Sequence, residues 1–203
     1  QEIRLFGADG KFVRLVGRKG QGPGEFAQPN GIRLAPDGSL WVNDHRNARF
    51  VSFTGEGEFL RQFVVPTWGW GYRWDGVFDA QGRLMETFSM RAPGATASTQ
   101  AIRRFDPVRA KFDTLTIPAC YPMSGAYQDW SVQWKGDKVS GVFSIPFAPL
   151  KVNRIDPAGA WACATGDEYR AKVVKLGTDE TVVEIKSASA PIPISAAARD
   201  SAV

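Results

Sequence analysis

Short runs of hydrophobic residues, separated by glycine, proline or polar residues, fill the whole chain. Residues 32–34, 40–42 and 50–53 are examples. Runs of this length that are rich in β-branched and aromatic side chains are typical of strands. Turn formers such as Pro36 and Gly38 follow one another too closely for helices to fit between them. The pattern predicts an all-β protein built from short strands.

A strand–turn–strand unit recurs along the chain in two forms. The first form occurs in residues 3–17, 50–64, 102–117 and 173–185. We expect equivalent places in these four segments for Phe6, Phe53, Phe105 and Leu176. The second form alternates with the first, in residues 32–44, 76–88, 132–143 and 152–165, with turns marked by Gly38, Gly82, Gly136 and Gly159. One unit of each form makes four strands in about 40–50 residues, which is the size of one propeller blade.

The repeat therefore predicts a β-propeller of four-stranded antiparallel blades, with about four blades in this chain. Each blade of a propeller is covered on both faces, so its inner strands can be continuously apolar, as residues 40–42 are. A two-sheet sandwich is the main alternative, but it does not explain a period of two hairpins.

The glycine-rich stretch GRKGQGPGEF, residues 17–26, permits two interpretations. A phosphate-binding loop needs a strand before it and a helix directly after it. Here the next residues carry Pro29, Gly31 and Pro36, which do not suit a helix. The stretch therefore indicates a connector between strands, in which glycine supplies positive φ angles and tight reversals.

Residues 17–61 resemble an NHL repeat. The resemblance rests on a glycine-rich lead-in, GEF..P.GI from residue 24, PDG at 36–38, NDHRNARF at 43–50 and a closing GEFL. More loosely, residues 1–186 resemble the six-bladed β-propeller proteins of bacterial envelopes, including GDEYRAKVVKLGTDETVVEI near the end.

This resemblance implies six blades in the full protein, so we interpret the chain as a fragment; a closed ring of four blades is the alternative. Residues 1–186 are then an incomplete propeller, and 187–203 are a linker or the start of a further segment, with Ser195 as a helix cap. The resemblance also implies a periplasmic, secreted or lipid-anchored protein, although no signal peptide is visible in the chain.

Charge and cysteine content narrow the function further. The net charge of +4 is spread along the chain without a basic run, so nucleic-acid binding is not expected. No apolar stretch approaches about 18 residues, so no membrane span is predicted. Cys120 and Cys163 are expected to be two separate buried thiols, with a disulfide between them as the alternative.

The turn around His45, the single histidine of the chain, is the first candidate for chemistry. Asp44, His45 and Asn47 carry side chains that can bind a metal ion. The favoured interpretation is structural: Asp44 and Asn47 bond the backbone of their own turn, and Arg49 pairs with Asp44. With one histidine and no GxSxG motif, no catalytic residue is assigned. No cofactor or metal site is expected, although a divalent cation such as calcium stays open as an alternative.

The aromatic stretch TWGWGYRWDG, residues 67–76, is the best candidate for binding. In an extended strand its alternating rings lie on one side and form a stacking platform. The candidate ligand-binding residues are Trp68, Trp70, Tyr72, Arg73, Trp74 and Asp75. The interpretation that we favour is that these rings fill the wedge between adjacent blades, where bulky side chains are needed in any case. The stretch YQDW at 127–130, with Trp134, is a weaker second candidate.

These features favour a non-enzymatic propeller of the bacterial envelope that binds a protein, peptide or carbohydrate. The alternative is a metal-dependent hydrolase, lactonase or lyase on the same scaffold.

Overall fold

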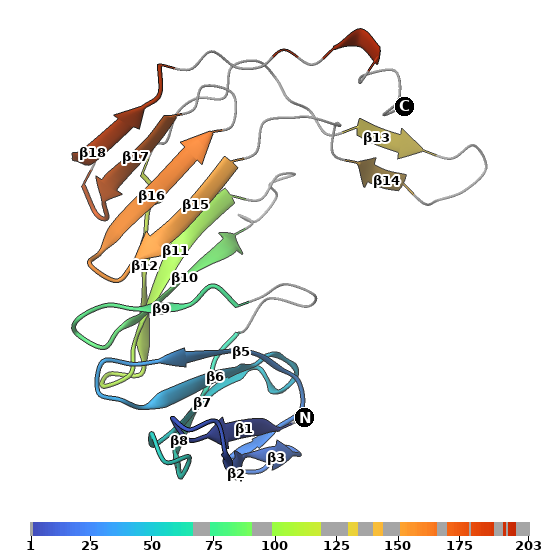
Figure 1. Ribbon diagram of the computed structural model, residues 1–203, viewed down its shortest axis with the longest axis vertical. Helices are drawn as coiled ribbons and strands as arrows, with labels where there is room; N and C mark the ends of the chain where they lie inside the picture. The colour runs from blue at the N-terminus through green and yellow to red at the C-terminus, as the bar shows by residue number, and fades with distance from the viewer. Residues whose placement is uncertain are drawn as a thin grey trace. The chain divides into compact units, whose positions relative to one another are not determined.

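The computed structural model describes residues 2–66, 74–90, 99–118, 130–133, 140–143, 151–165, 170–178, 180–188, 193 and 195–197 (Figure 1). The chain divides into two compact units, residues 1–117 with 155–159 and residues 118–154 with 160–203. The regular elements of the described residues are almost all strands, which confirms the predicted all-β class. No membrane-spanning helix occurs in this described part of the chain.

Three four-stranded antiparallel sheets, each in simple sequential order, are found in the described residues (Figure 1). Blade 1 consists of β5 (Pro29–Leu34), β6 (Leu40–Asp44), β7 (Arg49–Phe53) and β8 (Phe59–Val64). Blade 2 consists of β9 (Val77–Phe78), β10 (Leu84–Met90), β11 (Thr99–Asp106) and β12 (Lys111–Leu115). Blade 3 consists of β15 (Lys151–Asp156), β16 (Ala160–Thr165), β17 (Arg170–Lys175) and β18 (Thr181–Lys186). The predicted propeller blades are therefore present.

Shorter sheets complete the described strands. Strands β1 (Ile3–Phe6) and β2 (Phe12–Val16) form an antiparallel hairpin, which we call the half-blade. Within the glycine-rich stretch, β3 (Arg18–Lys19) and β4 (Glu25–Phe26) pair in parallel. A further hairpin joins β13 (Trp130–Gln133) and β14 (Ser140–Phe143). Because β5 and not a helix follows the stretch, the prediction of a connector is confirmed.

The turns within the blades use glycine as the sequence predicts. Gly38 has a φ of 82° and donates its N–H to the carbonyl of Ala35 at 2.9 Å. Gly82 has a φ of 75° and bonds the carbonyl of Asp79 at the same distance. A residue with a Cβ is strained at such a φ, so these hairpins require glycine.

Aromatic rings form the core between blades 1 and 2. The ring of Trp41 stacks on Phe63 at 5.5 Å and meets Phe78 edge-on at 5.3 Å. Phe105 of blade 2 lies 5.9 Å from Phe50 and 5.0 Å from Phe63. These rings bury a large apolar area and fix how the two blades pack.

A second core joins the half-blade to blade 1. Its buried members are Val16, Phe26, Val42, Val51 and Phe53. Ile3, Leu5 and Leu40 pack against it. Residues 2–66 are therefore one continuous packed region in which the half-blade covers one face of blade 1.

Two predictions need correction. In blade 3 the place of Phe6, Phe53 and Phe105 belongs to Val174, not Leu176, because Val174 pairs with Thr181 as Phe6 pairs with Phe12 and Phe53 with Phe59, whereas residue 176 lies in the turn after β17. Cys163 is disulfide-bonded, and the sequence holds one other cysteine, Cys120. The expectation of two separate thiols is wrong, since spacing in the sequence does not report distance in space.

The C-terminal predictions are only partly covered. Residues 196 and 197, directly after Ser195, are helical, as the predicted helix cap requires. The division of the chain at residue 186 stays a prediction.

Candidate functional site

Three loop segments meet at one edge of blades 1 and 2. The 3-10 helix η1 (His45–Asn47) joins β6 to β7, residues 27–31 enter and begin β5, and residues 65–66 and 74–76 are the described ends of the connection from β8 to β9. The N–H of His45 donates to the carbonyl of Gln28 at 3.1 Å. The N–H groups of residues 65 and 74 donate to residues 48 and 30 at 2.8 and 3.2 Å.

Asp44 is a fully buried carboxylate at the end of β6. It accepts hydrogen bonds from the backbone N–H groups of Ala27 at 3.1 Å and Gln28 at 2.8 Å. The side-chain amide of Asn47 donates to it at 2.6 Å, and Arg49 forms an ion pair with it at 3.4 Å. These partners offset the cost of burying the charge.

Arg49 extends the same cluster into the glycine-rich stretch. One terminal nitrogen donates to the carbonyl of Gln21 and to the side chain of Gln62, both at 2.9 Å. The other donates to the carbonyls of Gly22 at 3.0 Å and Glu25 at 2.8 Å. The planar guanidinium thus serves four acceptors, which a lysine cannot do.

The predicted structural turn is therefore only partly as expected. The ion pair between Asp44 and Arg49 is present. The backbone partners differ: Asp44 binds residues 27 and 28, and Asn47 donates to the carbonyl of Gly20 at 3.1 Å. The cluster holds the connector against blade 1 instead of closing its own hairpin, because the connector folds back over the end of β6.

No group of three or more His, Cys, Asp or Glu side chains that could hold a metal ion is found among the described residues. The carboxylate of Asp44, one of the three candidate ligands of the alternative metal site, already accepts from three donor groups. The expectation that the protein has no cofactor or metal site stays a prediction.

Trp74 is fixed in the core at the C-terminal end of the aromatic stretch. Its side chain is 3 % exposed, and its ring stacks on Phe50 at 5.6 Å. The guanidinium of Arg33 lies 5.4 Å over the ring and donates to the Trp74 carbonyl at 2.5 Å. A Cβ at Gly31 would lie 2.8 Å from the Cβ of Trp74, so glycine is needed for this approach. This position agrees with the favoured interpretation, in which the ring fills the wedge between blades.

The indole of Trp74 is hydrogen-bonded to a buried ion pair of blade 2. The indole N–H donates to Glu86 at 2.7 Å, and Arg103 donates to the other oxygen of Glu86 at 2.6 Å. Glu86 is 5 % exposed and Arg103 is 8 % exposed. Burial raises the pKa of Glu86 above its ordinary value, while the Arg103 charge and the indole N–H act in the opposite direction.

The position of this pair in the repeat makes it unusual. Glu86 pairs with Arg103 in the register of blade 2, as Val42 pairs with Val51 in blade 1. Both valines are fully buried. Blade 2 thus carries a charge pair where blade 1 is apolar. Our sequence analysis missed this pair, although aligning residues 84–88 with 40–44 places Glu86 at a core position.

Asp75 is half-buried beside Trp74 and accepts a hydrogen bond from the hydroxyl of Thr87 at 2.5 Å. The other predicted ligand-binding residues, Trp68, Trp70, Tyr72 and Arg73, lie outside the described residues, as does most of the YQDW stretch. Their assignment as a platform stays a prediction.

Residues 1–68 match the model of a family described as a 6-bladed beta-propeller. No curated protein matches the sequence. Among solved structures, one similar to this chain is described as an exported protein from Bacteroides fragilis. The identity is 13 % and the TM-score 0.48, over 91 % of this chain and 65 % of the Bacteroides fragilis chain.

Virginiamycin B lyase from Staphylococcus aureus is similar with 15 % identity and a TM-score of 0.41, over 93 % of this chain and 64 % of the lyase. This chain therefore spans less than two thirds of the length of these solved proteins. The family match confirms the resemblance to six-bladed β-propeller proteins, over the residues that form the half-blade and blade 1.

Proposed function

We propose that this chain is part of a non-enzymatic, ligand-binding β-propeller of the bacterial envelope, and that the aromatic residues 68–73 contact the ligand. The observation that supports this is the anchoring of both ends of the aromatic stretch. Val65 is 2 % exposed and bonds Ala48, and Trp74 is 3 % exposed and bonds Asn30. A loop that starts and ends on a rigid scaffold can present its side chains with little loss of entropy on binding.

The composition of the stretch suits such a role. Trp68, Trp70 and Tyr72 alternate with glycine, and Arg73 precedes the anchor. Aromatic rings contribute large contact areas at a low cost in side-chain entropy, and they stack on sugar rings and on peptide side chains. The proposed partners are therefore a carbohydrate, a peptide or a segment of another protein.

The experiment compares the wild type with Trp70→Ala and Trp74→Ala. The probes are a glycan array and a phage-displayed random peptide library, followed by titration of any selected probe. We expect Trp70→Ala to weaken probe binding by tenfold or more and to leave the unfolding midpoint nearly unchanged. Trp74→Ala should instead lower the free energy of unfolding by about 3–5 kcal/mol, because a buried ring is removed.

Two results would contradict the proposal. One is a Trp70→Ala variant that binds the selected probe as the wild type does. The other is a stability loss in Trp70→Ala as large as that in Trp74→Ala, which would place residue 70 in the core as well.

The proposed location outside the cytoplasm is supported by the disulfide of Cys163, because disulfides persist in oxidising compartments. Expression in the bacterial cytoplasm and in the periplasm, followed by non-reducing mass spectrometry of proteolytic peptides, tests this. We expect the cross-linked peptide only in the periplasmic product. A periplasmic product that lacks the disulfide and is as stable as a sample of the same protein with the disulfide formed would count against the location.

A further inference from the structure

One cross-strand residue pair of the repeat occurs at the equivalent position in four of the described sheets, so the burial of its first member can be compared between them. The bonded partners at this place are Phe6–Phe12, Phe53–Phe59, Phe105–Phe112 and Val174–Thr181. In three of the four sheets the first member is almost completely buried: Phe53 is 2 % exposed, Phe105 1 % and Val174 1 %. In the half-blade, Phe6 is 54 % exposed.

The reason for the burial is known for two of these residues. Phe53 of blade 1 belongs to the core that contains Val16 of the half-blade. Phe105 of blade 2 packs on Phe50 and Phe63 of blade 1. In both cases the side chain is covered by the sheet that precedes it in the chain.

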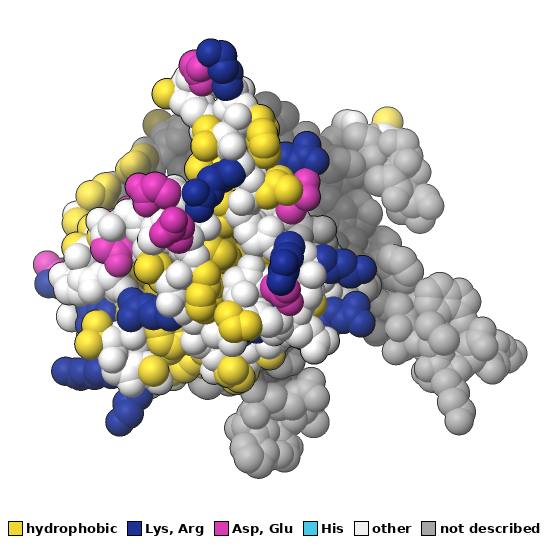
Figure 2. Space-filling view, turned by 90° about the horizontal axis from the view of Figure 1, so that it is seen from below, with side chains coloured by type: hydrophobic (Ala, Val, Ile, Leu, Met, Phe, Trp, Pro, Cys, Tyr) yellow, Lys and Arg dark blue, Asp and Glu magenta, His cyan; other side chains and the backbone are white. Residues whose placement is uncertain are grey.

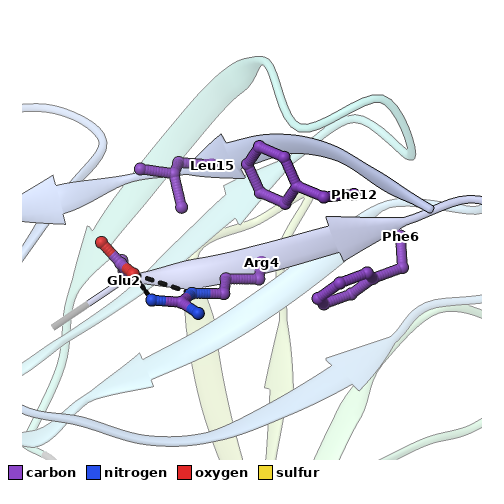
Figure 3. Close-up of a pocket in the computed structure, with 5 residues that line it drawn as sticks. All are labelled: Glu2, Arg4, Phe6, Phe12 and Leu15. Carbon is purple, nitrogen blue, oxygen red and sulfur yellow. Dashed lines mark hydrogen bonds and ion pairs between the residues drawn. The ribbon is translucent and has the colours of Figure 1, made fainter. Parts of the chain in front are cut away.

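The half-blade presents Phe6 on the face that does not contact blade 1. Ile3 and Leu5 pack toward blade 1, and successive strand residues point to opposite faces. Phe6 therefore lies on the other face, where Phe12 is 56 % exposed and Leu15 49 % exposed. Together with Glu2 and Arg4 they line an open depression of about 370 Å³ (Figure 3). We call Phe6, Phe12 and Leu15 the outer face.

Other properties of the hairpin agree with a covered position. Arg4 hydrogen-bonds Glu2 at 2.8 Å, so the charges at the rim are already paired (Figure 3). Figure 2 shows hydrophobic side chains exposed among the charged ones on the face turned toward the reader. Within the described residues β1 pairs only with β2, whereas its equivalent β7 pairs with both β6 and β8. The hairpin is thus the outer half of a blade.

We propose that the outer face is a blade–blade interface and that a further blade of the same protein covers it. The occupant should present an apolar, aromatic-rich sheet face, as blade 1 does to Phe105. The family that matches residues 1–68 is described as six-bladed, which is more than the described sheets supply.

The size of the outer face favours a covalently linked blade over a second copy of the chain. A whole buried Phe side chain contributes about 150–250 Å². Three side chains that are about half exposed therefore offer a few hundred Å², well below the roughly 800 Å² per partner of a stable interface. A blade in the same chain needs less area, because its effective concentration is in the millimolar range.

The test is thiol labelling of Phe6→Cys with a maleimide under non-reducing conditions. The same substitution is made in the 203-residue chain and in the product of the complete reading frame. Leu15→Cys provides a second position on the outer face. Val108→Cys, at a side chain that is 88 % exposed in the β11–β12 turn, is the matched control.

We expect positions 6 and 15 to react rapidly in the 203-residue chain and at least about tenfold more slowly in the complete protein. Position 108 should react equally in both. Equal reactivity of positions 6 and 15 in the two proteins would overturn the proposal, as would a complete reading frame that adds no further strands. Protection in the short chain that rises with protein concentration would assign the face to a second copy and overturn it too.

Discussion

The buried Glu86–Arg103 pair allows a test that separates an ion pair from its apolar counterpart. Blade 1 holds Val42 and Val51 at the same register positions, so the fold itself accepts valine there. We therefore expect Glu86→Val and Arg103→Val each to be strongly destabilising, while the double variant is tolerated.

The magnitudes follow from what each substitution leaves behind. Loss of one partner of a buried pair costs about 3–5 kcal/mol. Glu86→Val also removes the acceptor of the Trp74 indole N–H, which adds about 1–3 kcal/mol. In the double variant both charges are gone, and an apolar replacement of a buried pair contributes between zero and about 4 kcal/mol of stability. Set against the lost indole bond, the double variant should lie within about 3 kcal/mol of the wild type.

The assay is urea unfolding followed by circular dichroism, with the four proteins arranged as a double-mutant cycle. We expect a coupling free energy of at least about 3 kcal/mol. The matched control is the pair of Arg104 and Asp113, which are also bonded across adjacent strands but are partly exposed. Its coupling should be about 0–1 kcal/mol. A Glu86–Arg103 coupling no larger than that of the control would refute the reasoning.

Two further predictions concern the same region. Arg49→Lys keeps the charge but loses the planar guanidinium, so we expect faster amide hydrogen exchange in residues 20–28, measured by mass spectrometry. The control Arg46→Lys, at an exposed position, should leave the exchange unchanged. Equal exchange in the two variants would contradict the role of Arg49. Because burial raises the pKa of Glu86 in the folded state, the wild type should lose stability as the pH rises above about 4.5, the ordinary value, whereas Glu86→Gln should lack that loss. Parallel stability–pH curves for the two proteins, from thermal unfolding between pH 4 and 8, would show that Glu86 does not titrate in this way.

The strand content and the repeat were predictable from the sequence. Turn residues such as Gly38 and Gly82 require a positive φ, and the short apolar runs between such turns suit strands only. These are local properties of the backbone and of neighbouring side chains. For that reason the sequence also predicted that the glycine-rich stretch is a connector.

The partners of the buried polar groups depended on tertiary structure. Asp44 binds the backbone 16 and 17 residues away, and Arg49 reaches acceptors in the same connector. The sequence left Trp74 between a surface platform and the wedge between blades, and only the structure showed that its indole N–H meets Glu86 inside the protein. No spacing rule predicts such contacts, because they arise only when strands pair in one register and sheets pack face to face.

The sequence by itself determined that the chain forms short strands in propeller-like hairpins. Only the tertiary structure decided which equivalent positions are covered, as the contrast between Phe53 and Phe6 demonstrates. The two residues have the same local setting, so no local property distinguishes them. What differs is the neighbouring sheet, and burial is a property of the packed assembly of sheets and not of any one strand.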